Sequence, residues 1–117
     1  MPIYLDIFNR TGYKVVHQNL ESVIGCVLKE KGVAGPVELS ISVVNKDEMA
    51  DLHLKYLKTR EATNVLSFPT EEGVSADGIR HLGDIVVCED FVRGQKDMEF
   101  LVEHGLRHLL GEHHNDS

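Results

Sequence analysis

Two spacings of apolar residues alternate along the chain, and together they predict its secondary structure. A spacing of two residues, or a short β-branched run, indicates a strand, whereas a spacing of three to four residues indicates a helix. Strand patterns occupy residues 3–8, 37–44, 64–68 and 81–88. Helix patterns occupy residues 13–31, 45 to about 56, and 95–110. The order β-α-β-α-β-β-α predicts an α+β fold, a single domain in which about three helices accompany a small mixed four-stranded sheet.

The second predicted helix carries signals at its start and along one face. Asn45 can cap its first turn, and Glu48 stands three residues later in the position of a capping-box partner. Met49, Leu52 and Tyr56 recur at helical spacing. We therefore expect these three side chains to form the buried stripe of that helix.

Composition narrows the class of protein. The 117 residues are enough for one domain, which we place at residues 1–117, and 42% of them are hydrophobic. No apolar run reaches the roughly 18 residues that a membrane span needs. The first residues show neither a basic segment nor a long apolar one, so we expect a cytoplasmic protein. Cys26 and Cys88 are the only cysteines, and we expect both to be reduced, buried thiols.

The net charge has consequences for nucleic-acid binding. The formal net charge is −7, which argues against non-specific binding of nucleic acid through a broad basic surface. A local basic patch around a site, or an RNA contact shared with a larger particle, remains compatible with this charge.

Histidines concentrate near the end of the chain. Four of the seven lie in the last fourteen residues, and three of them fit the pattern H-x-x-x-H-x-x-G-x-x-H at His104, His108 and His114. Positions i and i+4 of a helix project about 40° apart around the axis, so two imidazoles can reach one ion. Gly111 can end the helix in a left-handed residue and turn the chain so that His114 meets them. Three neutral imidazoles suit zinc and leave a fourth position open.

A simple polar helix face is the competing interpretation of these histidines. The apolar stripe of the last helix contains Met98, Leu101, Val102 and Leu109, with Gly105 placed for close contact with the sheet. His104 and His108 flank that stripe, which predicts a partly shielded position suited to ligands. For the metal site, His113 either points to solvent or replaces His114 if the turn differs, and the spacing from Gly111 favours His114.

The same spacing occurs in metzincin proteases, H-E-x-x-H-x-x-G-x-x-H, where the Glu is the general base. Gly105 occupies that position here. Glu103 lies on the wrong side of His104, and Glu112 lies beyond the helix end. The sequence therefore predicts a zinc site without a peptidase base.

Three segments, in this order, resemble the YbeY family. Residues 63–69 (TNVLSFP) resemble its T-[DN]-V-L-S-F-P segment, residues 82–87 (LGDIVV) its L-G-D-I-V-I segment, and residues 104–114 its H-G-x-L-H-L-x-G-Y-D-H motif. The resemblance covers nearly the whole chain. It implies a metal-dependent hydrolase, a single-strand-specific endoribonuclease that matures ribosomal RNA, notably the 3′ end of the small-subunit RNA, and acts in ribosome quality control. It also implies Zn²⁺ on His104, His108 and His114. The implied partners are ribosomal RNA, the small subunit and possible ribosome-associated proteins.

The chain departs from the family pattern at several positions. Leu57 stands where the family has a functional Arg, and Lys58 or Arg60 can supply the missing charge or be ordinary solvated loop residues. Arg107 replaces a usual Leu. Asn64 and Ser67 are candidates to shape a substrate groove, or to satisfy backbone groups at a strand edge.

Two other functions remain open at this stage. One is a zinc hydrolase of another substrate, against which Gly105 argues. The other is a non-catalytic module in which zinc stabilises the C-terminal part and the domain binds the ribosome or a GTPase partner. The general base, the native metal and the oligomeric state do not follow from the sequence.

Overall fold

The computed structural model describes residues 2–57, 64–70 and 73–111 of the chain. Its elements, in order, are β1 (Ile3–Asn9), α1 (His17–Glu30), β2 (Val37–Val44), α2 (Lys46–Leu57), β3 (Val65–Pro69), β4 (Arg80–Cys88), the short 3₁₀ helix η1 (Glu89–Phe91) and α3 (Gln95–Leu109). The predicted α+β order of four strands and three helices is confirmed. Of the helices in the described part of the chain, none combines the length and the apolar character that crossing a bilayer requires.

The four strands form one mixed sheet in the order β1-β2-β4-β3. β1 pairs with β2 in parallel, β2 pairs with β4 in parallel, and β3 runs antiparallel to β4. The two parallel pairs are joined through crossovers that carry helices, as parallel strands require. β1 and β3 are the two edges of the sheet.

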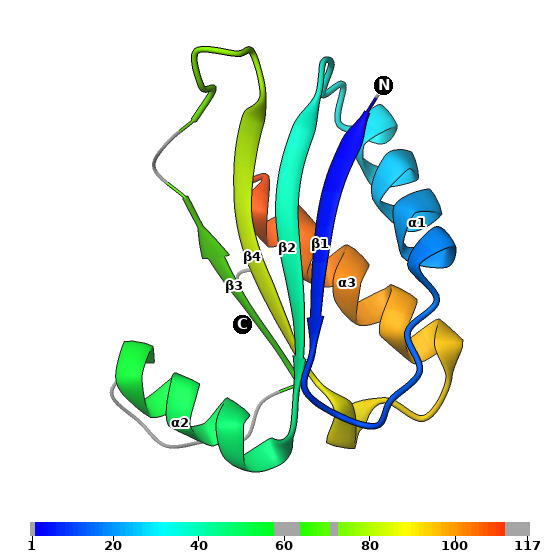
Figure 1. The fold of residues 1–117 in the computed structure, drawn as a ribbon, viewed down its shortest axis with the longest axis vertical. Coiled ribbons are helices and arrows are strands. Elements are labelled where there is room, and N and C mark those ends of the chain that lie inside the picture. Colours follow the sequence, from blue (N-terminus) through cyan, green and yellow to red (C-terminus); the bar gives the residue numbers. More distant parts are fainter. Residues whose placement is uncertain (1, 58–63, 71–72, 112–117) are drawn as a thin grey trace.

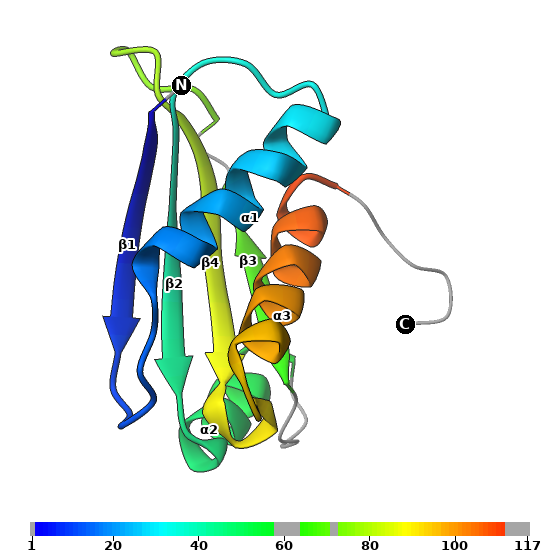
Figure 2. The same ribbon diagram turned by 90° about the vertical axis from the view of Figure 1, so that its right-hand side faces the viewer.

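The two faces of the sheet have different coverings. Helices α1 and α3 lie side by side on one face, whereas α2 lies beyond the carboxyl end of β2 (Figures 1 and 2). The side chains of β2 differ in burial between the two faces of the sheet. Its fully buried side chains face the two helices and are Val37, Leu39, Ile41 and Val43. Its other face carries Glu38, Ser40 and Ser42, which are only half-buried. The main core therefore lies between the sheet and the pair α1 and α3.

Helix α1 begins at His17, four residues later than the pattern predicted. The Asn9 side chain explains the delay, because it accepts a hydrogen bond from the Thr11 backbone N–H (3.0 Å) and donates one to the Tyr13 carbonyl (2.5 Å). A local side-chain bond of this kind satisfies backbone groups that a helix would otherwise use. The chain consequently turns through residues 9–13 before the helix starts.

Helix α2 keeps its predicted cap but not its predicted stripe. The Asn45 side chain accepts the Glu48 N–H at 2.9 Å, while the Glu48 carboxylate lies against Arg10 (Oε2···Nη1 3.4 Å). Met49 is fully buried, yet Tyr56 is 52% exposed, so its assignment to a buried stripe was wrong. The physical reason is that α2 projects past the sheet (Figure 1), so that Tyr56 lies beside the Phe68 ring, with ring centroids 4.8 Å apart, and is not covered by the core.

The two cysteines differ in their surroundings. Both are free thiols, as predicted, but only Cys88 is buried and Cys26 is exposed on α1. Burial raises the pKa of the Cys88 thiol above its ordinary value, with smaller contributions from the nearby carboxylates. Cys26 occupies the outer face of an amphipathic helix, which its small size and moderate polarity allow. The prediction of two buried cysteines was therefore wrong for Cys26.

Candidate metal site on helix α3

Helix α3 packs on the sheet through one continuous face. The fully buried or nearly fully buried residues of this face are Met98, Leu101, Val102, Gly105 and Leu106. Leu106 was not in the predicted stripe, and Leu109, which was, packs against the core while only partly buried. The stripe holds α3 against the sheet and fixes which side chains stand at its margin.

His104 and His108 lie together at that margin. Their ring centroids are 4.6 Å apart, with the ring planes tilted by 54°, and both residues are half-buried. This confirms the predicted partly shielded position. One turn earlier, the Phe100 ring lies nearly parallel to that of His104, at 6.3 Å and 20°, and is 67% exposed. The spacing of the two imidazoles suits binding of one ion by both rings.

Gly105 sets the distance between this part of α3 and the sheet. A Cβ atom at Gly105 would lie 2.7 Å from the Cγ2 of Ile85 in β4 and 3.1 Å from the Ser67 Oγ in β3. Real Cβ contacts are essentially never shorter than 3.0 Å. The predicted close helix–sheet contact is therefore confirmed, and a Glu at this position, as in the metzincin pattern, would need the helix to move away from Ile85.

Ser67 and Asn64 serve backbone groups in the structure. The Ser67 hydroxyl donates to the Gly105 carbonyl at 3.0 Å. The Asn64 carbonyl accepts the Cys88 N–H at 2.9 Å. For Ser67, the structure gives evidence for the role in backbone satisfaction, because its side chain ties β3 to α3 beside the histidines. The Asn64 bond is made by the main chain and ties the start of β3 to the end of β4, so the role of the Asn64 side chain stays a prediction.

Arg107 links the two helices on the covered face of the sheet. Its guanidinium donates to Glu103 one turn earlier (Nε···Oε2 3.1 Å) and to Glu30 of α1 (Nη1···Oε2 2.6 Å). Hydrogen bonds to Glu30, and then to Glu103, raise the pKa of Arg107 further above its ordinary value. This role depends on a contact between residues 77 positions apart in sequence, so the sequence alone gave no signal for it. The Glu103 carboxylate is engaged in this ion pair with Arg107.

The end of α3 follows the predicted geometry as far as the structure describes it. Gly111 has a φ of +90°, and its N–H donates to the His108 carbonyl at 3.0 Å. This is the left-handed helix end that the H-x-x-x-H-x-x-G-x-x-H pattern requires. His114 and the alternative His113 lie outside the described residues, as do Lys58 and Arg60, which follow the last residue of α2. Within residues 2–57, 64–70 and 73–111, no three His, Cys, Asp or Glu side chains converge in a way that could hold an ion. The structure thus brings two predicted ligands together, and the complete three-histidine site stays a prediction.

Comparisons with known proteins identify the family of the chain. The family model described as "Endoribonuclease YbeY" matches residues 6–117. The chain is 35% identical to endoribonuclease YbeY of Corynebacterium efficiens over 128 residues, which is 94% of this chain and 64% of that protein. It is also 35% identical to the proteins of that name from Corynebacterium glutamicum, covering 96% of this chain and 66% of the relative, and from Nocardia farcinica, covering 94% and 68%. The chain therefore spans about two thirds of the length of these relatives.

A solved structure shows the same fold. The solution structure of TM1509 from Thermotoga maritima superposes with a TM-score of 0.55 and 24% sequence identity, over 97% of this chain and 76% of that one. At this identity the likeness establishes the arrangement of helices and strands alone. The match of residues 6–117 and the 35% identity to the corynebacterial proteins show that the chain belongs to the YbeY family.

Proposed function

We propose that the protein is a zinc-dependent endoribonuclease that cuts single-stranded RNA in the maturation of ribosomal RNA, at the 3′ end of the small-subunit RNA, and in ribosome quality control. The observation that carries the proposal is the pair of half-buried imidazoles on α3, with ring centroids 4.6 Å apart, in a chain of this family. The proposal includes a cytoplasmic location, the small ribosomal subunit and possible ribosome-associated proteins as partners.

The donor set of α3 fits zinc. His104 and His108 would hold the ion with His114, and three imidazole nitrogens are a ligand set that zinc uses at sites with an open position. When bound, zinc would supply a Lewis acid able to polarise a phosphate oxygen or activate water. The absence of a side chain at Gly105 lets the turn that carries both histidines lie close to Ile85, and the Ser67 hydroxyl ties that turn to β3. Lys58 or Arg60, from the segment after α2, would offset negative charge in the transition state.

The proposed site also offers a surface for an unpaired base. Phe100 is 67% exposed and lies one turn from His104. Stacking of a base on an aromatic ring contributes about 1–3 kcal/mol to single-strand binding. Phe100→Ala is therefore expected to weaken binding of a short single-stranded RNA by roughly 5- to 150-fold, while Phe100→Tyr retains it. Fluorescence anisotropy with labelled RNA measures both, and Phe91→Ala, an exposed ring outside α3, is the control. An equal loss in the Phe91 variant would remove Phe100 from the binding surface.

The proposal is tested by cleavage of matched RNAs. The protein, freed of metal by a chelator and then supplied with zinc, is incubated with one RNA as a single strand and as a perfect duplex. We expect cleavage of the single strand only, lost with the chelator and regained with zinc. Cleavage that persists in a Lys58→Ala, Arg60→Ala double variant would remove both cations from the mechanism, and cleavage unaffected by the chelator would contradict the metal dependence.

A non-catalytic ribosome-binding module is the second candidate function. The net charge of −7 favours it, because a nuclease that binds free RNA gains affinity from basic surface. Stoichiometric zinc without cleavage of any RNA would support the module. Cleavage of a peptide library instead of RNA would point to a zinc hydrolase of another substrate.

A further inference from the structure

Three rings follow one another along the margin of α3 at intervals of four residues: Phe100, His104 and His108. The two imidazoles are in contact, with ring centroids 4.6 Å apart and planes tilted by 54°. Phe100 and His104 are arranged differently, because their planes lie within 20° of parallel and their centroids are 6.3 Å apart. This second pair therefore presents two nearly parallel rings with a space between them.

The width of this space matches one flat base. Stacked bases of a nucleic acid strand are separated by about 3.4 Å, so a base held between two rings needs them about 6.8 Å apart. The Phe100 and His104 rings fall short of that separation by only about 0.5 Å. Phe100 is 67% exposed, so the faces of its ring are largely uncovered. Rotation of an exposed side chain of this kind is fast and can open the space to the required width.

The charges on α3 favour recognition of a base over recognition of the phosphate backbone. Arg107 is the cation closest in sequence to the two histidines, and its guanidinium is engaged by Glu30 and Glu103. Glu99 adds a further carboxylate to the helix, and the net charge of the chain is −7. A single strand would therefore gain its affinity here from stacking, which every base offers, and less from the salt-dependent pairing of phosphates with cations.

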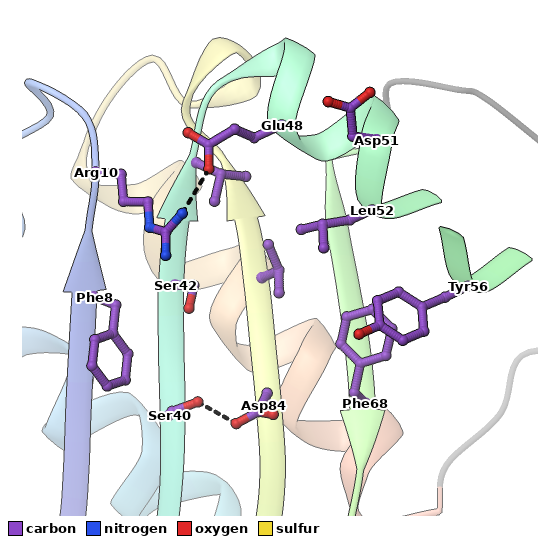
Figure 3. A pocket seen from close by; sticks show the side chains of 12 residues that line it. Phe8, Arg10, Ser40, Ser42, Glu48, Asp51, Leu52, Tyr56, Phe68 and Asp84 are labelled. Atoms are coloured by element: carbon purple, nitrogen blue, oxygen red, sulfur yellow. Dashed lines mark hydrogen bonds and ion pairs between the residues drawn. The ribbon is translucent and has the colours of Figure 1, made fainter. Parts of the chain in front are cut away.

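Exposed aromatic rings also line a cavity of about 670 Å³ on the opposite face of the sheet (Figure 3). Phe8 and Tyr56 are the more exposed of these rings. The charged side chains among the described lining residues are three carboxylates and one guanidinium, those of Glu48, Asp51, Asp84 and Arg10. This excess of negative charge repels the phosphates that flank every base of an RNA strand. The rings on α3 are therefore the better match for RNA.

We propose that Phe100 and His104 form a slot that binds one unpaired base of the RNA, with a preference for purines because their larger ring systems stack more strongly. A base inside a duplex is paired and already stacked on both sides, so it cannot enter the slot, and the slot thereby selects single strands. Zinc would bind His104 through a nitrogen in the plane of the ring, which leaves the ring face toward Phe100 for the base.

The place of this base in the substrate follows from the double role of His104. Because His104 is both a wall of the slot and a proposed zinc ligand, the bound base would belong to the nucleotide next to the phosphate that is cleaved. This placement rests on the proposed function. Binding of the base does not, because neither ring needs a metal in order to stack.

An oligouridine that carries a single 2-aminopurine tests the slot. The fluorescence of this purine is quenched when it stacks, and uridine neighbours stack on it weakly. With a chelator present, so that no metal is bound, we expect saturable quenching by the native protein. An abasic linker in place of the purine should weaken binding of the strand, measured by fluorescence anisotropy, roughly 5- to 150-fold. The same purine in a perfect duplex should show no quenching on addition of the protein.

Two single variants distinguish a slot from a one-sided platform on Phe100. Phe100→Ala and His104→Ala each remove one wall, and each is expected to weaken binding of the purine strand at least about fivefold. Loss of a metal ligand cannot explain the result for His104→Ala, because the chelator has already removed the metal. Phe100→Tyr keeps a ring and should retain quenching. Phe91→Ala is the control, because it removes an exposed ring outside α3, and it should bind as the native protein does.

Four results would overturn the inference. They are the absence of quenching in the native protein, undiminished quenching in His104→Ala, an equal loss of affinity in Phe91→Ala, and a salt dependence steeper than a logarithmic slope of about −1.4, the value for two phosphate contacts on a single strand. Circular dichroism of each variant confirms that the fold is intact. Since the measurement excludes metal, a failed slot leaves the zinc-dependent cleavage test unaffected. Quenching by a protein that cleaves no RNA would keep the slot and contradict the nuclease.

Discussion

The Gly83→Ala variant is expected to lose most of the stability of the fold. Gly83 has a φ of +131°, a conformation that L side chains rarely adopt. A Cβ atom there would lie 2.3 Å from the Phe68 carbonyl oxygen and 2.9 Å from the Pro69 Cα, both in the backbone of β3, and 3.1 Å from Leu109 of α3. Backbone atoms of a paired strand cannot move aside as a flexible side chain does. We therefore expect a loss of more than about 4 kcal/mol in the free energy of unfolding.

This loss is large against the total stability of a domain, roughly 5–15 kcal/mol. Urea unfolding followed by circular dichroism measures it, as a lower midpoint or as the absence of a cooperative transition. Gly78→Ala is the matched control, because Gly78 also has a positive φ, +85°, but a Cβ there meets nothing within 4 Å. The control isolates backbone strain, about 1–2 kcal/mol. Equal losses in the two variants would show that β3 shifts without cost and that the contact with Phe68 is not decisive.

Gly83 and Gly105 both allow close packing where α3 meets the sheet at β3 and β4. Gly83 lets β3 and the end of α3 approach β4, and Gly105 lets the middle of α3 approach Ile85. Both positions belong to segments that resemble the family pattern. The half-buried position of His104 and His108 therefore depends on two residues that lack side chains and do no chemistry themselves.

The order of elements was predictable because each element carries its own periodicity. β2 alternates between buried and half-buried residues from Val37 to Val43, and α3 buries one stripe. Errors arose where a long-range contact or a local side-chain bond outweighs periodicity. Asn9 delays α1, and α2 leaves Tyr56 exposed because helix placement relative to the sheet is not encoded in the helix pattern.

The histidine pair of α3 and the cavity on the opposite face of the sheet also differ in how far they can be predicted from local sequence patterns. His104, His108 and Gly111 lie within eight consecutive positions, so their spacing alone predicted the pair of imidazoles and the left-handed turn. The cavity on the face of the sheet opposite α1 and α3 draws nearly all of its lining from β1, β2, β3, β4 and α2. Such a site appears only when the strand order and register are known, so it could not be predicted from local patterns in the chain.

The His108→Ala variant is expected to lose the bound metal. With zinc supplied during purification, elemental analysis of the native protein should give about one zinc per chain. Removing one of three imidazoles leaves two ligands, too few to hold the ion through gel filtration. His17→Ala removes an imidazole from α1, where it pairs with Glu21 at 3.3 Å, and should retain full zinc content. The comparison separates specific coordination by α3 from weak binding to any histidine.

Zinc content also identifies the third ligand and tests whether the H-x-x-x-H-x-x-G-x-x-H pattern binds metal at all. His114→Ala should lose zinc and His113→Ala should keep it; the opposite pair of results would reassign the ligand to His113. Zinc should also raise the melting temperature of the native protein and not that of His108→Ala, since a ligand stabilises only the state that binds it. If the native protein binds no zinc and its melting temperature is unchanged, His104 and His108 are ordinary polar residues at the edge of the buried face of α3. The RNA cleavage proposed above would then have to proceed without metal, through groups that the H-x-x-x-H-x-x-G-x-x-H pattern does not supply.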